Sequence, residues 1–125
     1  MSEVKKKILI VDDEKELCDL LADHFEDKGY ETFTAYDGLD AKKLLLTNKY
    51  DLILTDILMP KMSGVDLLMF LQGVENPPPV IVITGFTDNE EKDLQNLGAY
   101  AVFYKPIDYK RLENMVKEVL YVDSE

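Results

Sequence analysis

Cysteine and long apolar runs are both scarce in this sequence, and each scarcity excludes a class of protein. Cys18 is the one cysteine in 125 residues, so neither an internal disulfide nor a cysteine-based zinc site can form. Because Cys18 lies among leucines, we expect a buried thiol. No apolar run approaches the ~20 residues that span a bilayer, and the polar start of the chain is not followed by the longer apolar region of a signal peptide. The sequence therefore predicts a cytoplasmic protein with no membrane segment.

Positive charge is also in short supply. The chain has 25 Asp and Glu against 14 Lys and Arg, a net charge of −11. That balance argues against nucleic acid or an anionic membrane surface as a direct partner, since both are negatively charged. It suits a protein that binds cations or basic partners, although solubility alone would explain it too. The apolar fraction of 46% is enough for a core, and the length predicts a single domain over residues 1–125.

Short β-rich runs alternate with helical patterns along the chain. The predicted strands are Lys7–Val11, Glu31–Ala35, Asp51–Thr55, Val80–Thr84 and Ala101–Tyr104. The first, third and fourth contain continuous apolar runs, which are typical of strands covered on both faces in a parallel sheet. Repeated strand–helix alternation predicts a doubly wound α/β domain, with right-handed crossovers that place helices on both faces.

Apolar residues at helical spacing fill the segments between the strands. The first helix is predicted to end at Gly29, and the last to follow Lys105-Pro106. The residues that mark the four clear helices are Leu17, Leu20, Leu21 and Phe25; Ala41, Leu44 and Leu45; Leu67, Leu68 and Leu71; and Tyr109, Leu112, Val116, Val119 and Leu120. The fourth helix, near Asp88–Leu97, has few strongly apolar residues, so we expect it to bury little surface and to be the least stable helix.

Polar residues follow the buried strands. Asp12 and Asp13 follow the first strand, Asp56 the third and Lys105 the fifth, while Thr84 ends the fourth. Because the carboxyl ends of parallel strands share one edge, where ligands bind at the topological switch point, these side chains should converge. Three carboxylates in one crevice repel one another without a counter-charge. Mg²⁺ suits the set, since it takes few protein carboxylates and keeps water or phosphate oxygens.

This combination fits phosphoryl transfer to a carboxylate. Asp56 would act as the nucleophile and form an aspartyl phosphate, while the metal and Lys105 stabilise the transferring group and Thr84 donates its hydroxyl. Taken singly, the residues have simpler interpretations: Asp13 could cap the first helix with Glu16 as its capping-box partner, and Thr84 could belong to a turn. Matched chemistry at four strand ends favours the site.

Five blocks of sequence carry a family resemblance: Ile10–Glu14, Asp56–Gly64, Ile83–Gly85, Gly98–Ala99 and Lys105–Pro106. The second block, Asp-x-x-Met-Pro-x-Met-x-Gly, is specific by itself. On these blocks the chain resembles the receiver domains of response regulators, the chemotaxis-regulator-like phosphoacceptor domains of two-component systems, over nearly its whole length. The resemblance implies a flavodoxin-like sheet of five parallel strands in the order 2-1-3-4-5.

The resemblance also implies a role for each site residue. Asp56 would accept phosphate from a histidine of a partner. Asp13 would bind Mg²⁺ directly and Asp12 through water, and Asp56 and the backbone carbonyl of Leu58 would complete the protein ligands. Thr84 and Lys105 would each bind a phosphoryl oxygen, and the bond between Lys105 and Pro106 is expected to be cis.

One position departs from the family's pattern. The family usually has Tyr or Phe three residues before the lysine, where the ring swings inward as the threonine moves, and this chain has Val102 there. Phe103 is one place further on, and one step along a strand reverses the face. The sequence leaves open whether a threonine–aromatic switch operates, with Tyr100 and Tyr104 as the other nearby aromatic residues.

We predict a regulatory domain that takes phosphate from a sensor histidine kinase or phosphotransfer protein and then changes its partner-binding surface. That surface is predicted on the fourth helix, the fifth strand and the last helix, for an effector that the sequence does not name; a homodimer is left open. Its own chemistry would be Mg²⁺-dependent self-phosphorylation and slow autodephosphorylation. The resemblance implies that Leu58 and Phe86 border the path of an attacking water, and both side chains are apolar.

Two alternatives from other classes remain. A phosphatase of the aspartyl-phosphate type uses the same residue types, but carries Asp-x-Asp after its first strand, which this chain lacks. A phosphate-independent binding module of the same fold is disfavoured by the intact set of site residues, while Val102 keeps it open. Whether the protein continues beyond Glu125 as a longer regulator is also left open.

Overall fold

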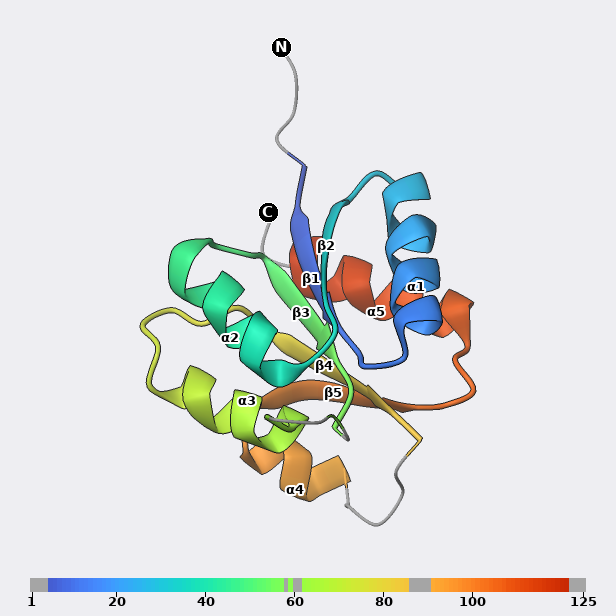
Figure 1. The fold of residues 1–125 in the computed structure, drawn as a ribbon. Coiled ribbons are helices and arrows are strands. Elements are labelled where there is room, and N and C mark those ends of the chain that lie inside the picture. Colours follow the sequence, from blue (N-terminus) through green and yellow to red (C-terminus); the bar gives the residue numbers. More distant parts are fainter. Residues whose placement is uncertain (1–4, 58, 60–61, 86–90, 122–125) are drawn as a thin grey trace.

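The structure is a computed structural model that describes residues 5–57, 59, 62–85 and 91–121. Its centre is a five-stranded parallel sheet in the order β2-β1-β3-β4-β5 (Figure 1). The strands are β1 (Lys7–Val11), β2 (Glu31–Ala35), β3 (Leu52–Thr55), β4 (Val80–Thr84) and β5 (Ala99–Tyr104). The predicted strand order is confirmed, and so is each predicted strand to within two residues.

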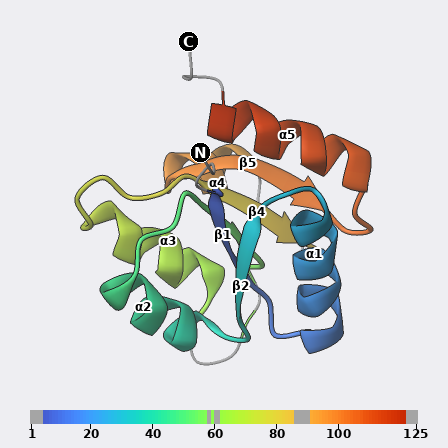
Figure 2. The same ribbon diagram turned by 90° about the horizontal axis from the view of Figure 1, so that it is seen from above.

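Five helices lie on the two faces of this sheet. They are α1 (Lys15–Asp27), α2 (Gly38–Thr47), α3 (Gly64–Gln72), α4 (Glu91–Asn96) and α5 (Tyr109–Tyr121). α1 and α5 cover one face, and α2, α3 and α4 cover the other (Figure 2). This is the doubly wound arrangement that the alternation of strands and helices predicts. Among the described residues, no helix combines the length and the apolar composition needed to cross a membrane.

The central strands are apolar throughout because each face of the sheet has its own core. Along β1, Ile8 and Ile10 pack with α1 and α5, while Leu9 and Val11 pack with α2 and α3. All four are at most 1% exposed. A strand buried on both faces has no polar side to present, which is why its sequence does not alternate.

The ends of α1 follow from local chemistry. Gly29 has φ of 99°, the left-handed conformation that glycine adopts without steric cost, and it follows the C-cap residue Lys28. Within α1, Cys18 is fully buried and its thiol contacts the carbonyl oxygen of Ile10 at 3.5 Å. Burial raises the pKa of this thiol to about 12. The predicted buried, unreactive cysteine is therefore confirmed in its placement.

β5 is the strand on which prediction and structure differ most. It begins at Ala99 rather than Ala101, and its pairing with β4 shifts between Val80 and Ile81. Val80 pairs with Ala99 and Ile81 with Ala101, so Tyr100 is an extra residue in the ladder, as in a β-bulge. As a result, Ala99 and Ala101 pack in opposite cores although they are two residues apart.

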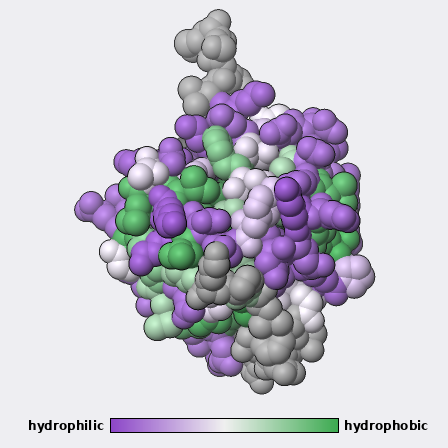
Figure 3. All heavy atoms as spheres, viewed as in Figure 1, coloured by the Kyte–Doolittle hydropathy of each residue, from purple (hydrophilic) through white to green (hydrophobic). Residues whose placement is uncertain are grey.

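α4 is the shortest helix described and was predicted to be the weakest. It has six residues, and Leu94 is its one fully buried apolar side chain among the described residues. The predicted start of this helix at Asp88 lies outside the described residues. The visible surface is mostly polar, with apolar side chains reaching it over α2, where Leu39 and Leu46 are exposed (Figure 3).

Candidate functional site

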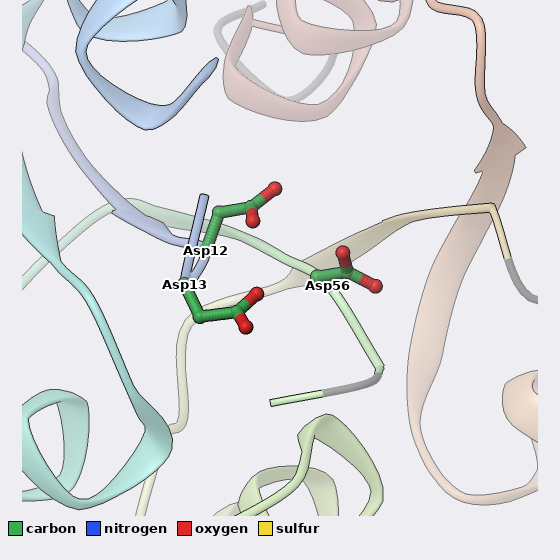
Figure 4. Close-up of side chains that lie close together, drawn as sticks. All are labelled: Asp12, Asp13 and Asp56. Atoms are coloured by element: carbon green, nitrogen blue, oxygen red, sulfur yellow. The ribbon is translucent and has the colours of Figure 1, made fainter. Parts of the chain in front are cut away.

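The three predicted carboxylates converge at the carboxyl edge of the sheet. Asp12 and Asp13 follow β1 and Asp56 follows β3, and their side chains lie beside one another beyond the ends of these strands (Figure 4). One carboxylate oxygen of each lies within 4.8 Å of the other two. Asp12 and Asp56 are buried, whereas Asp13 is exposed. The cluster thus combines two shielded carboxylates with one that solvent reaches.

Backbone hydrogen bonds that continue the sheet place Asp12 and Asp56. The amide of Asp12 donates to the carbonyl oxygen of Ala35 at 3.1 Å, and the amide of Asp56 donates to that of Val11 at 3.0 Å. The side chains are then fixed by amides further along the chain. Asp12 Oδ1 accepts from the amide of Glu14 at 2.9 Å, and Asp56 Oδ1 accepts from the amide of Ile57 at 2.6 Å.

Lys105 enters the carboxylate cluster from the end of β5. Its amide donates to the carbonyl oxygen of Thr84 at 2.9 Å, which ties the end of β5 to the end of β4. Its Nζ donates to Asp56 Oδ2 at 2.8 Å, to Glu14 Oε1 at 3.0 Å and to Asp12 Oδ2 at 3.2 Å. The bond between Lys105 and Pro106 is cis, as expected. One ammonium therefore serves three carboxylates.

Burial and charge oppose each other at this site. Burial raises the pKa of Asp12 above its usual value and the charge of Asp56 adds to the rise, although the amide of Glu14 and the charge of Lys105 act against it. Burial disfavours the charge of Lys105, but its hydrogen bonds to Asp56 and Glu14 outweigh that effect and raise its pKa. The lysine is thus held firmly as a cation, and Asp12 ionises reluctantly without further positive charge.

Thr84 lies at the same edge and completes the set that topology predicts. It is the last residue of β4, is 1% exposed, and pairs in register with Tyr104, the residue before Lys105. Asp12, Asp13, Asp56, Thr84 and Lys105 are therefore all at one edge, as the sequence predicts. The carbonyl of Leu58 and the side chain of Phe86 lie outside the described residues.

This geometry agrees with what the comparisons with known proteins find. The family model described as "Response regulator receiver domain" matches residues 8–117. The chain belongs to the response regulator receiver domains. It is accordingly a regulatory module of two-component signal transduction.

Individual relatives cover this receiver domain almost completely. It is 33% identical to sporulation initiation phosphotransferase F of Bacillus subtilis (strain 168), over 97% of this chain and 98% of the relative. It is 35% identical to the alkaline phosphatase synthesis transcriptional regulatory protein PhoP of the same organism, over 94% of this chain but 49% of that longer protein. Similar chains thus occur both nearly alone and as about half of a larger protein.

A solved receiver domain gives the same fold. The response regulator protein TrrA from Thermotoga maritima, in complex with Mg²⁺-BeF, superposes with a TM-score of 0.84. It is 31% identical and the match covers 92% of this chain and 99% of that one. The predicted flavodoxin-like architecture is confirmed by this likeness.

The simpler interpretation of Asp13 as a helix cap is wrong for this receiver domain. α1 begins at Lys15 and its N-cap residue is Glu14, whose side chain makes no capping hydrogen bond. Asp13 therefore lies one residue before the cap, with its carboxylate in the cluster instead. The reason is that the Asp12 carboxylate takes the amide of Glu14, which sets the turn into the helix one residue later.

Two residues that shape the site were given no function in the sequence analysis, although both lie in the blocks that match the family. Glu14 contacts Lys105, and Gly64 begins α3 directly against the backbone of Asp56. A Cβ at Gly64 would clash with the carbonyl oxygen of Asp56 and lie 2.9 Å from Cα of Ile57. The glycine that ends the specific second block was the available signal for this close approach.

The departure at Val102 has a clear structural outcome. Val102 is half-buried and packs with the core on the α4 side of the sheet. Phe103 is buried on the opposite side, with the guanidinium of Arg111 from α5 at 5.3 Å from its ring centre. Phe103 thus lies on the wrong face to replace the missing ring, as predicted. Tyr100 and Tyr104 are both exposed.

Proposed function

We propose that this receiver domain accepts a phosphoryl group on Asp56 from a phosphohistidine of a sensor kinase or phosphotransfer protein. The observation that supports the proposal is the hydrogen bond from Lys105 Nζ to Asp56, beside Asp12 and Asp13. A buried carboxylate that is next to both a fixed cation and further carboxylates is arranged for group transfer rather than for a structural ion pair.

In the transfer step, a carboxylate oxygen of Asp56 attacks phosphorus in line with the phosphorus–nitrogen bond of the donor. A phosphorus–oxygen bond forms, the phosphorus–nitrogen bond breaks, and its electron pair stays on the leaving imidazole nitrogen, which takes a proton. Lys105 balances charge on the transferred group. Thr84, at the adjacent strand end, offers its hydroxyl to a phosphoryl oxygen.

Mg²⁺ is the metal that the donor set fits. Within the described part of the chain, the candidate ligands are carboxylate oxygens, one each from Asp12, Asp13 and Asp56, and they lie within 4.8 Å of one another. Hard oxygen donors in small number match a cation that keeps several waters. We propose Asp13 and Asp56 as direct ligands, Asp12 as a ligand through water and the Leu58 carbonyl as the further protein ligand. When bound, the metal offsets negative charge on the transferring group.

We further propose that partners read the state of Asp56 on α4, β5 and α5. Tyr100 and Tyr104 are exposed on β5, and α4 buries Leu94 deeply but is only six residues long. A short helix with few buried contacts changes its arrangement at low cost. The effector is not identified, and pairing of two copies through this surface stays a hypothesis.

We also propose that residues 1–125 form one domain that acts in the cytoplasm, and that its phosphate is lost slowly. One continuous sheet supports the single domain. The slow loss follows from the apolar side chains of Leu58 and Phe86, which cannot orient a water.

Intact-mass spectrometry tests the acceptor. With a small acyl phosphate and Mg²⁺, we expect one added phosphoryl group on the wild type and none on Asp56→Asn. Asp51→Asn is the matched control, because Asp51 lies at the other end of the same strand segment, where it accepts from the amide of Lys7 at 2.8 Å. Undiminished labelling of Asp56→Asn would overturn the assignment.

A further inference from the structure

Lys105 uses all of its hydrogen-bonding capacity in the structure. A lysine ammonium has three N–H donors and no acceptor. The three carboxylates of Asp12, Glu14 and Asp56 accept from it at 2.8–3.2 Å. No donor remains for a new oxygen. Transfer to Asp56 converts its carboxylate into an acyl phosphate, so the donor that Asp56 holds passes to one phosphoryl oxygen. Lys105 can bind a second phosphoryl oxygen only if its bond to Asp12 or to Glu14 is given up.

The three bonds differ in what it costs to break them. The side chains of Asp12 and Asp56 are 4% and 7% exposed, whereas that of Glu14 is 65% exposed. If Asp12 lost its cation, it would keep an uncompensated charge away from water, and such a loss is strongly destabilising. An exposed carboxylate exchanges the same bond for water at little cost. Of the two carboxylates that remain after the transfer, Glu14 is thus the one that Lys105 releases more readily.

The Glu14 carboxylate makes few contacts within the described part of the chain. It is the N-cap residue of α1, but its side chain makes no capping bond, so helix formation does not depend on its carboxylate. Lys105 is its one side-chain partner among the described residues. A carboxylate with this single contact adds negative charge to a site that already contains three acids, which works against an incoming anion.

We infer that Glu14 is a positioning residue that holds Lys105 in the unphosphorylated protein and competes with the phosphoryl group for its ammonium. In this arrangement Glu14 lowers the affinity of the site for a phosphoryl-like group, and Lys105 exchanges the Glu14 carboxylate for a phosphoryl oxygen. The inference rests on the proposed function of Asp56 and adds a residue that tunes it.

The test measures binding of beryllofluoride, a tetrahedral group that adds to a carboxylate as phosphoryl does, by NMR titration at saturating Mg²⁺. Glu14→Ala should bind about 1.5- to 5-fold more tightly than the wild type, which corresponds to an exposed ion pair. Glu16→Ala removes the same charge two residues away, and should bind as the wild type does because Glu16 is exposed and does not contact Lys105. Glu14→Asp keeps the charge but withdraws the carboxylate by one methylene, so it should resemble Glu14→Ala.

A second readout needs neither metal nor ligand. In the free protein, the ammonium signal of Lys105, assigned by its absence in Lys105→Ala, should shift in Glu14→Ala and stay in place in Glu16→Ala. Unchanged or weaker beryllofluoride binding by Glu14→Ala overturns the inference, and so does equal tightening by Glu16→Ala, which would indicate charge at a distance. If the wild type itself binds no beryllofluoride, the proposed role of Asp56 fails instead.

Discussion

Replacing Gly64 by alanine should displace the proposed phosphoacceptor without touching its side chain. The added Cβ would clash with the carbonyl oxygen of Asp56 and lie 2.9 Å from Cα of Ile57, where ordinary contact begins at 3.4 Å. Both obstacles are backbone, so no side-chain rotation relieves them. The start of α3 or the backbone of Asp56 has to move. Overpacking of this kind destabilises the folded state by about 1–3 kcal/mol. Alanine also lowers the conformational entropy of the unfolded chain relative to glycine, which offsets about 0.4–1 kcal/mol of that loss.

We therefore expect Gly64→Ala to lower the free energy of unfolding by about 1–2 kcal/mol. A shift of about 1 Å in a reacting group costs up to roughly 100-fold in rate, so labelling by a small acyl phosphate should slow at least about tenfold. Urea denaturation and timed intact-mass spectra measure the two effects.

Gly73→Ala is the matched control at the other end of the same helix. Gly73 has φ of −93°, and the nearest atom to an added Cβ is the carbonyl oxygen of Phe70 at an ordinary 3.7 Å. Gly73→Ala should be more stable than the wild type by about 0.4–1 kcal/mol, through the same effect on the unfolded chain, and should label at the same rate. If Gly64→Ala were as stable as the wild type and labelled at the same rate, the close approach of Gly64 to the backbone of Asp56 would be refuted. Lost stability with unchanged labelling would refute only the link to Asp56.

Three further predictions concern the carboxylates and the phosphate lifetime. Mg²⁺ should raise the melting temperature by binding the native state alone, and Asp13→Ala should remove that rise; a wild type indifferent to the metal contradicts the site. In metal-free protein, Asp12→Asn should raise the urea midpoint at neutral pH. The folded pKa of Asp12 is above its unfolded value because of burial, so the stability from its protonated form is present below the unfolded pKa and lost as pH rises through the folded one. The gain from Asn should therefore shrink toward about pH 4, and an equal gain at both pH values contradicts the reasoning. Loss of phosphate from the purified phosphoprotein should be slow, and Leu58→Asn or Phe86→Glu should speed it by about tenfold if one water-orienting hydrogen bond is gained; no acceleration in either variant excludes these side chains as the cause.

Much of this receiver domain followed from local features of its sequence. The continuous apolar runs of β1, β3 and β4 predicted strands buried on two faces, because only such strands lack a polar side. Topology alone then brought Asp12, Asp56 and Lys105 to one edge, since the strand order of a doubly wound sheet leaves few choices. The residue types supplied the chemistry, and the family's blocks supplied their proposed roles.

Tertiary structure decided the features that depend on how distant segments pack. The bulge at Tyr100 arises where β5 pairs with β4, and no local pattern in Ala99–Tyr104 marks it. The close approach of Gly64 to Asp56 depends on where α3 starts relative to β3. The choice of Glu14 as a partner for Lys105 joins residues 91 positions apart in the chain. Each is a matter of a few ångströms between separate elements, whereas sequence patterns report only which face of an element is apolar.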